Sequence, residues 1–409
     1  MSAEEVLSDG QTNIRDNSIH LKKKIEEKFG TEEELIKLVK YLAQKCYLVV
    51  VSTSDDESAY RIFSVLNDRG MQLSNTDILK AEIIGAIPKA EQGDYTEKWE
   101  RIEEDLERDP FNELFTHIRM IKRKVKAKEA ILKEIREHVK PKERPKDFID
   151  RELIPYAEAF DDIKKATFES ASNAELINGY LRWLNKLGNE DWVPSAISFL
   201  EKWGRTDTKR VVDFFERLER LAFGLHVMRI NINGRIERYG KVLSAIENGE
   251  DPAALESSLS LSGEECRSIH DALASNIYGT QFAKYLLLRL DASLSEGEAR
   301  YEHPIVSIEH VLPQNPAENS EWMKLFSDGG EREKLTHCLG NLLLLSRRKN
   351  SGAQNYEFER KKSEYFAQNE VCSFALTTEV LKHDQWTPEV IYERQNRLLA
   401  RCSDIWKLD

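Results

Sequence analysis

Apolar residues recur at helical spacing through almost every segment between residues 93 and 290, and this pattern most restricts the folds open to the chain. The segment TKRVVDFFERLERLAFGLHVMRI follows the i, i+3/i+4, i+7 rule, with an apolar face made of Val211, Val212, Phe215, Leu218, Ala222 and Leu225. GTQFAKYLLLRLD, 279–291, predicts a further buried helix. We therefore expect a long helical body over 93–290.

The first 92 residues have a more mixed pattern. Residues 19–45 predict helices, whereas CYLVVVST, 46–53, is a β-branched run suited to a buried strand. After the turn sequence NDRG, Ser74 or Asn75 can cap the next helix. These residues predict an incomplete α/β piece before the helical body.

Composition sets the broad class. A chain of 409 residues with 32% charged residues suggests about two or three folded domains. Its sequence has no run long enough to span a membrane and no signal-peptide core. The five scattered cysteines form no CxxC pair, which argues against a zinc site or a disulfide framework and fits a reducing cytoplasm.

Charge gives one candidate nucleic-acid surface. The net charge of −12 provides no global attraction to nucleic acid, but residues 121–146 carry eleven Lys or Arg against four Glu. Such a window can follow a phosphate backbone. The competing interpretation, which we favour, is a solvated charged helix followed by a proline-containing linker.

After residue 304 the helical periodicity gives way to segments that predict strands. PIVSIEHVLPQNP, 304–316, predicts a strand that ends in Glu309 and His310, whose side chains then point to opposite faces. In HCLGNLLLLSRRKNSG, 337–352, the run Leu342–Leu345 is typical of a strand buried on both faces, or of a short core helix. Because Asn341 starts this run and polar residues follow it, we expect a strand leading into a short helix that carries Asn350.

This order resembles the ββα-metal, or HNH, nuclease site. His310 is suited to be the general base that activates water, since an imidazole with a pKa near 6.5 is largely neutral at pH 7. Glu309 and the amide oxygen of Asn350 are hard ligands for Mg²⁺ or Mn²⁺, which would stabilise charge on the scissile phosphate. Asn341 would orient the His310 ring through its second nitrogen or the nearby backbone. Three basic residues can clamp phosphate beside the metal, although a solvated helix start explains them equally well: Arg347, Arg348 and Lys349.

A more specific resemblance covers roughly residues 300–409. The chain contains I-E-H-x-L-P-Q, L-G-N-L-x-L-L, F-x-x-K-K and W-T-x-x-x-I-x-x-R in this order, and it ends in I-W. This combination is similar to the C-terminal domain of the GmrSD family, type IV modification-dependent restriction enzymes. The resemblance implies an HNH-type nuclease and assigns Glu309, His310, Asn341 and Asn350 to its active site.

The N-terminal part resembles the same family. AYRIFSVLNDRGMQLSNTDILKAEI, 59–83, is similar to the end of its ParB/sulfiredoxin-like N-terminal domain. In that family a D-G-Q-Q-R motif is associated with nucleotide hydrolysis. In this chain Asp9–Gln11 is followed by Thr-Asn and lies only about fifty residues upstream, so we expect a truncated N-terminal domain and regard nucleotide dependence as doubtful.

These observations predict a mainly α (α+β) protein with three parts. They are a remnant of the N-terminal domain (1–92), a helical body (93–290) and a ββα-metal nuclease domain (291–409). The predicted function is that of a cytoplasmic, metal-dependent endonuclease of phage defence that acts on double-stranded, modified phage DNA. A catalytically silent DNA-binding or partner-binding remnant is the alternative. The sequence leaves open whether a homo-oligomer forms, and the absence of HExxH argues against a metalloprotease.

Overall fold

The computed structural model of the chain describes residues 9–47, 74–251, 258–295, 306–346, 355–366 and 374–408. Its contacts divide the chain into two units, Met1–Leu73 and Ser74–Asp409. The division falls just before a helix that begins at Asn75, and the predicted boundaries at 92/93 and 290/291 stay predictions. The fold class is confirmed, because the described residues are mainly helical and include a small sheet.

The described part of the first unit consists of two helices, α1 (Asp9–Lys28) and α2 (Glu32–Lys45). Thr31 begins α2 with a capping box, in which its hydroxyl accepts from the Glu34 backbone and the Glu34 carboxylate accepts from the Thr31 backbone. The helices predicted within 19–45 are confirmed. The strand predicted at 46–53 lies mostly outside the described residues, and Cys46 and Tyr47 are not helical.

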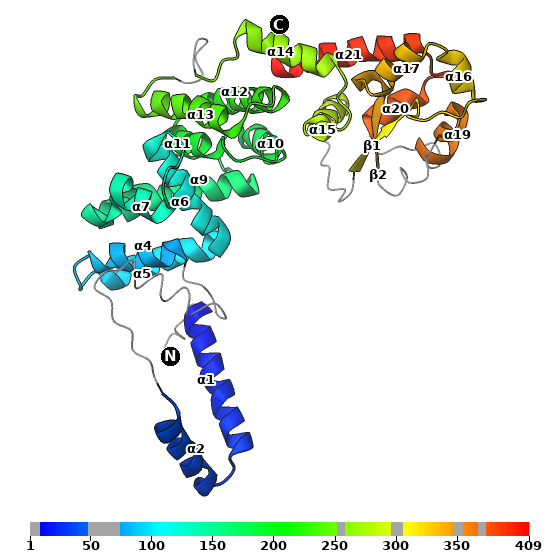
Figure 1. Cartoon of the computed structure of the whole chain (residues 1–409). Helices are drawn as coiled ribbons and strands as arrows, with labels where there is room; N and C mark the ends of the chain where they lie inside the picture. The colour runs from blue at the N-terminus through cyan, green and yellow to red at the C-terminus, as the bar shows by residue number, and fades with distance from the viewer. Residues whose placement is uncertain are drawn as a thin grey trace. The chain divides into compact units, whose positions relative to one another are not determined.

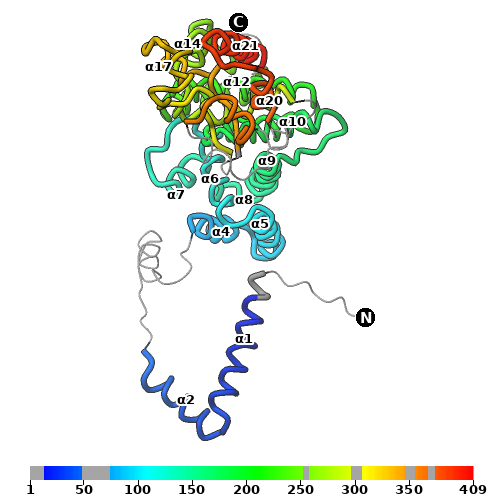
Figure 2. Tube along the Cα trace, turned by 90° about the vertical axis from the view of Figure 1, so that its right-hand side faces the viewer, coloured from blue at the N-terminus to red at the C-terminus, as the bar shows by residue number. Residues whose placement is uncertain are grey.

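The helical body follows the periodicity of the sequence. Its long helices pack in neighbouring pairs such as α4 with α5 and α9 with α11, and Figures 1 and 2 both show α4 beside α5. These helices are α4 (Asn75–Gly85), α5 (Gln92–Leu106), α6 (Arg108–Arg123), α9 (Ile154–Lys165), α10 (Ala174–Leu184), α11 (Val193–Trp203), α12 (Thr208–Val227), α13 (Ile232–Glu247), α14 (Gly263–Ala274) and α15 (Ala283–Leu294). Shorter turns connect α6 to α9, namely α7 (Ile131–Glu134), η1 (Ile135–Val139), η2 (Pro141–Glu143), α8 (Pro145–Phe148) and η3 (Ile149–Leu153).

Local sequence explains where these helices begin. The Ser74 hydroxyl accepts from the Asp77 backbone N–H, and the Asp77 carboxylate accepts from the Ser74 backbone N–H. Of the two predicted caps of α4, the residue that caps it is therefore Ser74. In α12 the predicted apolar face is buried except for Val212, which is half-buried and packs against the core. The helix predicted within 279–291 is also confirmed as α15.

The sheet consists of two antiparallel strands, β1 (Val306–His310) and β2 (Leu342–Ser346). Glu309 lies opposite Leu343, and His310 lies opposite Leu342. Successive side chains of β2 enter two different clusters of buried apolar residues: Leu342 and Leu344 join the large core of the helical body, whereas Leu343 and Leu345 join a smaller one. The prediction of a strand buried on both faces is therefore confirmed.

Helices surround this sheet on both sides. They are α16 (Glu321–Leu325), α17 (Gly329–Thr336), η4 (Leu339–Asn341), α19 (Phe358–Arg360), η5 (Lys361–Phe366), α20 (Ala375–Leu381) and α21 (Pro388–Trp406). Both α15 and α20 pack on β2, as Figure 1 shows. The last helix is fixed to the helical body, because the Trp406 ring stacks on Phe223 of α12 at 3.7 Å and its indole donates to buried Glu219. The strand pair is thus built on a continuous core rather than on a free tail.

The described helices also bear on the predicted absence of a membrane span. None of them combines the length and the apolar character needed to cross a bilayer.

Candidate active site at the end of strand β1

The end of β1 separates two adjacent polar side chains. Glu309 and His310 are both buried, with exposed fractions of 9% and 4%. Neighbouring residues of a strand point to opposite faces, and their contacts differ accordingly. Glu309 meets a lysine, whereas His310 enters a group of aromatic and polar rings.

The ring of His310 has a partner at each nitrogen. Its Nε2 lies 3.1 Å from Nδ1 of His337, which comes just before η4. Its Nδ1 lies 3.3 Å from Nε2 of Gln314, an exposed residue of the loop after β1. The ring of Tyr278 packs edge-on against His310 with ring centroids 4.1 Å apart. The imidazole is therefore held in a fixed orientation.

The surroundings of His310 keep it neutral. Burial lowers its pKa to about 3, and the neighbouring His337 and Lys361 add to this effect. A neutral imidazole can accept a proton at any physiological pH. The residue is thus available as a base, although a weak one before substrate binds.

Glu309 forms a buried ion pair with Lys361 of η5. Lys361 is fully buried, and its Nζ lies 3.0 Å from Oε1 of Glu309 and 2.7 Å from the backbone oxygen of His310. Burial raises the pKa of Glu309, and Lys361 opposes that shift; burial likewise lowers the pKa of Lys361, with Glu309 opposing. One ammonium group therefore fixes both the carboxylate and the backbone at the end of β1.

Asn341 acts on the backbone after His310. It is fully buried, and its Oδ1 accepts from the Leu312 backbone at 2.8 Å and from the Trp386 indole at 3.0 Å. Its Nδ2 donates to the carbonyls of Leu312 and Thr336. These bonds reach the backbone after His310, while Gln314 and His337 contact the ring itself, and the role of Asn341 in orienting the ring stays a prediction.

Four other predicted site residues lie outside the described residues: Asn350, Arg347, Arg348 and Lys349. Their roles, and the helix predicted to carry Asn350, stay predictions. Glu309 and His310 are adjacent at one strand end, and Asn341 is joined to the same loop.

Two family models match the chain. One, described as GmrSD restriction endonucleases, C-terminal domain, covers residues 267–401, and the other, described as GmrSD restriction endonuclease, N-terminal domain, covers residues 2–84. Together they span more than half of the sequence. The chain belongs to the GmrSD family of type IV restriction endonucleases. No curated protein and no solved structure matches it.

The GmrSD sequence pattern corresponds to contacts that build the site. Gly340 allows η4 to approach α21, since a Cβ there would lie 2.5 Å from the backbone oxygen of Ile391. The buried guanidinium of Arg394 donates to the carbonyls of Gly340 at 2.8 Å and Leu342 at 2.9 Å. Gln395 accepts from the Gly340 backbone. The W-T-x-x-x-I-x-x-R segment of α21 therefore holds the chain that enters β2.

Three residues at the site were not predicted from the sequence: His337, Gln314 and Lys361. Two of them have a signal in the GmrSD pattern, because Gln314 ends I-E-H-x-L-P-Q and Lys361 is the first lysine of F-x-x-K-K. His337 comes four residues before Asn341, at the start of the second quoted segment. The sequence pattern does not show that the fold brings these three residues into contact with Glu309 and His310.

The basic window 121–146 is mostly neutralised within the fold. It is divided among the end of α6, an irregular stretch and the short turns α7 to α8. Seven of its eleven basic side chains form ion pairs with Asp or Glu: Lys122, Lys124, Lys133, Arg136, Lys140, Arg144 and Lys146. These pairs favour a structural role for most of this charge over a continuous DNA-binding surface.

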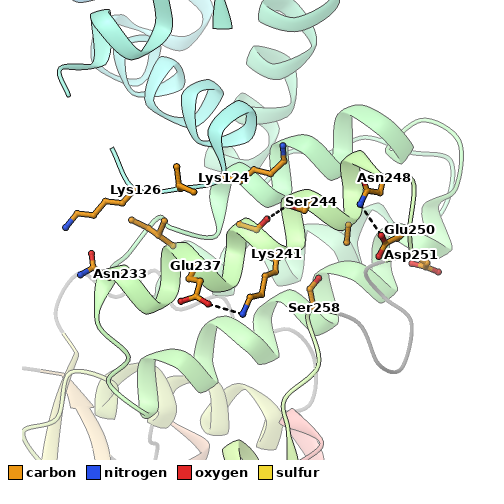
Figure 3. A pocket seen from close by; sticks show the side chains of 14 residues that line it. Lys124, Lys126, Asn233, Glu237, Lys241, Ser244, Asn248, Glu250, Asp251 and Ser258 are labelled. Carbon is orange, nitrogen blue, oxygen red and sulfur yellow. Dashed lines mark hydrogen bonds and ion pairs between the residues drawn. The ribbon is translucent and has the colours of Figure 1, made fainter. Parts of the chain in front are cut away.

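A large open cavity of about 1030 Å³ lies beside this window. Figure 3 shows Lys124 and Lys126 on one side of it and Asn233, Glu237 and Lys241 of α13 on another. Two of the charges that line it form an ion pair, with Lys241 Nζ 3.0 Å from Glu237 Oε1. No predicted site residue lines this cavity, so volume alone does not indicate where the chemistry occurs.

Proposed function

We propose that the end of β1 is the catalytic centre of a divalent-metal-dependent DNA endonuclease of phage defence. His310 is the general base that activates water, and Glu309, with Asn350, holds the metal ion. The single observation that supports this proposal best is a buried, neutral imidazole fixed at a strand end next to a buried carboxylate.

The hydrogen bonds of His310 indicate which nitrogen meets the water. The side-chain amide of Gln314 donates to Nδ1 of His310, so Nδ1 carries the lone pair of the ring. The proton of the ring is then on Nε2 of His310, which donates to Nδ1 of His337. Gln314 is exposed and its contact is the longer of the two, so a water can replace it at Nδ1. His337 then keeps the ring in place while Nδ1 accepts the proton, as a general base must be held within hydrogen-bond reach of the proton it takes.

The carboxylate of Glu309 is paired with Lys361 through Oε1, so a hard cation would have to bind the other oxygen or displace the ammonium. A carboxylate is the ligand type that Mg²⁺ and Mn²⁺ prefer, and Lys361 already neutralises this one in the folded chain. A bound divalent ion would supply Lewis-acid stabilisation of the phosphate charge. Lys361 also donates to the backbone carbonyl of His310, so one residue fixes the position of the Glu309 carboxylate relative to the backbone of His310.

The proposed substrate is double-stranded phage DNA with modified bases, which the chain would meet in the cytoplasm. Membership of a restriction endonuclease family supports DNA as the substrate. The test is cleavage of plasmid DNA and of phage DNA bearing modified cytosine, in Mg²⁺ and in Mn²⁺, by the parent, by His310→Ala and by His270→Ala. His270 is a half-exposed histidine of α14 and serves as the matched control.

We expect His310→Ala to lose about 10²–10⁴-fold in cleavage rate, which is the usual contribution of general base catalysis. His270→Ala should cut like the parent. Equal cutting by His310→Ala would show the assignment to be wrong. A parent protein that retains DNA but never nicks it in either metal would support the catalytically silent DNA-binding alternative.

A further inference from the structure

A second group of metal-ligating side chains lies in the helical body, away from β1. Glu113 and His117 are one turn apart on α6, and i, i+4 spacing places them on the same face of the helix. Glu190 belongs to the turn before α11, where its backbone oxygen accepts from Val193. One ligand atom from each of the three residues lies within 4.8 Å of the others.

His117 supplies an independent sign of a missing partner. Its side chain is only 6% exposed, and its Nε2 has no hydrogen-bond partner. That nitrogen points toward Glu113, 3.7 Å from Oε1, which is beyond hydrogen-bond distance. Phe160 packs on the ring edge-on, with centroids 5.0 Å apart. Buried polar atoms are nearly always satisfied, so an unpartnered nitrogen facing two carboxylates needs an explanation.

The position between the two carboxylates already holds positive charge. Lys164 of α9 places its Nζ 3.1 Å from Glu113 Oε2 and 3.0 Å from Glu190 Oε1. Burial opposes the charge of Lys164, but the bonds to Glu190 and Glu113 outweigh it and raise its pKa. The lysine satisfies the carboxylates and leaves the imidazole Nε2 without a hydrogen bond, whereas a metal ion would use all three groups.

We propose that Glu113, His117 and Glu190 form a site for a divalent transition-metal ion of the zinc type, which enters by displacing Lys164. One imidazole nitrogen and two carboxylate oxygens, completed by water, are a ligand set that Zn²⁺ accepts. With metal–ligand bonds of about 2.0–2.1 Å, tetrahedral ligand atoms lie about 3.4 Å apart, so ligand atoms that are up to 4.8 Å apart must approach by up to about 1.4 Å. Lys164 has room to leave, because it is a long side chain at a partly exposed position.

The ion would connect α6 to the turn that begins α11. Its ligands are Glu113, His117 and Glu190, and it shares no residue with the proposed nuclease site at Glu309 and His310. The inference does not rest on the proposed function. Binding of the ion should stabilise the helical body, because an ion that binds only the folded state shifts unfolding to higher temperature.

Zinc affinity, measured by competition with a chromophoric chelator, tests the site in the full chain. The variants are Glu190→Gln, His117→Gln and Lys164→Met, with Glu250→Gln and His138→Gln as controls outside the cluster. Visible absorption of bound Co²⁺ reports the ligand set, and thermal unfolding with and without Zn²⁺ reports stabilisation. A fixed excess of Mg²⁺ in all samples limits the contribution of the nuclease site.

Glu190→Gln and His117→Gln should each weaken Zn²⁺ binding by about tenfold or more and change the Co²⁺ spectrum. Lys164→Met should strengthen binding, since it removes the competing cation, and Zn²⁺ should raise the melting temperature of the parent by a few degrees. Glu190 is half-exposed, so its variant should fold and the test stays decisive even where His117→Gln does not. Equal Zn²⁺ affinity in the parent and in Glu190→Gln would overturn the proposal.

Discussion

The side-chain amide of Asn341 pairs with the backbone of Leu312 in both directions. Leu312 N–H donates to Oδ1 at 2.8 Å, and Nδ2 donates to the Leu312 carbonyl at 3.0 Å. Since the backbone oxygen of Asn341 also accepts from Val311, one residue continues the β-ladder two positions past His310. The loop after His310 is therefore held by the side-chain amide of Asn341, which makes the two hydrogen bonds to Leu312 that a neighbouring strand would otherwise make.

Replacing Asn341 with Ala should destabilise the fold. The change removes four hydrogen bonds of a fully buried amide and leaves the Trp386 indole and the Leu312 backbone without partners. We expect a loss of about 3 kcal/mol or more in the free energy of unfolding, since each buried unsatisfied group costs about 1–3 kcal/mol. Urea denaturation measures it. Exposed Asn355→Ala is the control and should change little; a stable Asn341→Ala protein would contradict this account.

The sequence was sufficient to predict β1 and β2 and the positions of Glu309 and His310. An apolar run that ends in two polar residues and a continuous run of leucines are local signals, and both strands lie where they were expected. The partners of His310 could not be predicted in this way. His337 and Gln314 reach the ring only because η4 and the loop after β1 fold together, and Lys361, which bonds the His310 backbone oxygen, comes from fifty-one residues downstream.

In the helical body, too, the sequence predicted the helices but not the contacts between distant residues. Its periodic apolar faces predicted α12 and α15, but the charge window 121–146 could not be interpreted from sequence alone. Its partners include Glu82, Glu91 and Glu247, which come from helices and turns far along the chain. A count of charges within a window therefore overstated the positive charge that this segment presents to solvent.

A methyl group at position 340 should be poorly tolerated. The Cβ of Gly340→Ala would lie 2.5 Å from the Ile391 backbone oxygen and 3.0 Å from Gln395, so η4 must move away from α21. Overpacking of this kind costs about 1–3 kcal/mol. Gly93→Ala is the matched control, because nothing lies within 4 Å of its Cβ within α5, and it should be neutral or stabilise by about 0.5–1 kcal/mol. Similar melting temperatures for the two variants would argue against this packing.

Removing the lysine that faces Glu309 should be worse than removing both partners. Lys361→Met leaves a buried carboxylate unpaired, and breaking such a pair costs about 3–5 kcal/mol. The double variant Lys361→Met/Glu309→Leu removes both charges and should recover much of that loss. Chemical denaturation of the parent, both single variants and the double variant gives the coupling free energy. Additive losses would mean that the two charges do not depend on each other.

Acid should destabilise the fold partly through His310. Its folded pKa is about 3, whereas the unfolded value is 6.5. Between these values the unfolded chain binds more protons, so this contribution is complete above pH 6.5 and is lost as the pH falls toward 3, by up to about 1.4 kcal/mol per pH unit. The raised pKa of Glu309 acts in the opposite direction as the pH rises through its own range. His310→Gln should therefore lose less stability than the parent between pH 6.5 and 4, with His270→Gln as the control; identical slopes would show that His310 is not buried in a neutral state.

The pH dependence of cleavage provides a separate test of His310 as the base. Since kcat/KM reports groups of the free enzyme, a base with a pKa of about 3 should remain unprotonated from pH 8 down to pH 5. An ordinary histidine would lose activity about tenfold per pH unit below 6.5. We therefore expect no decline of kcat/KM near pH 6.5 when cleavage is measured at constant ionic strength and saturating Mg²⁺. A clear decline there in the parent would mean either that the ring is exposed before DNA binds or that the raised pKa of Glu309 reaches this range.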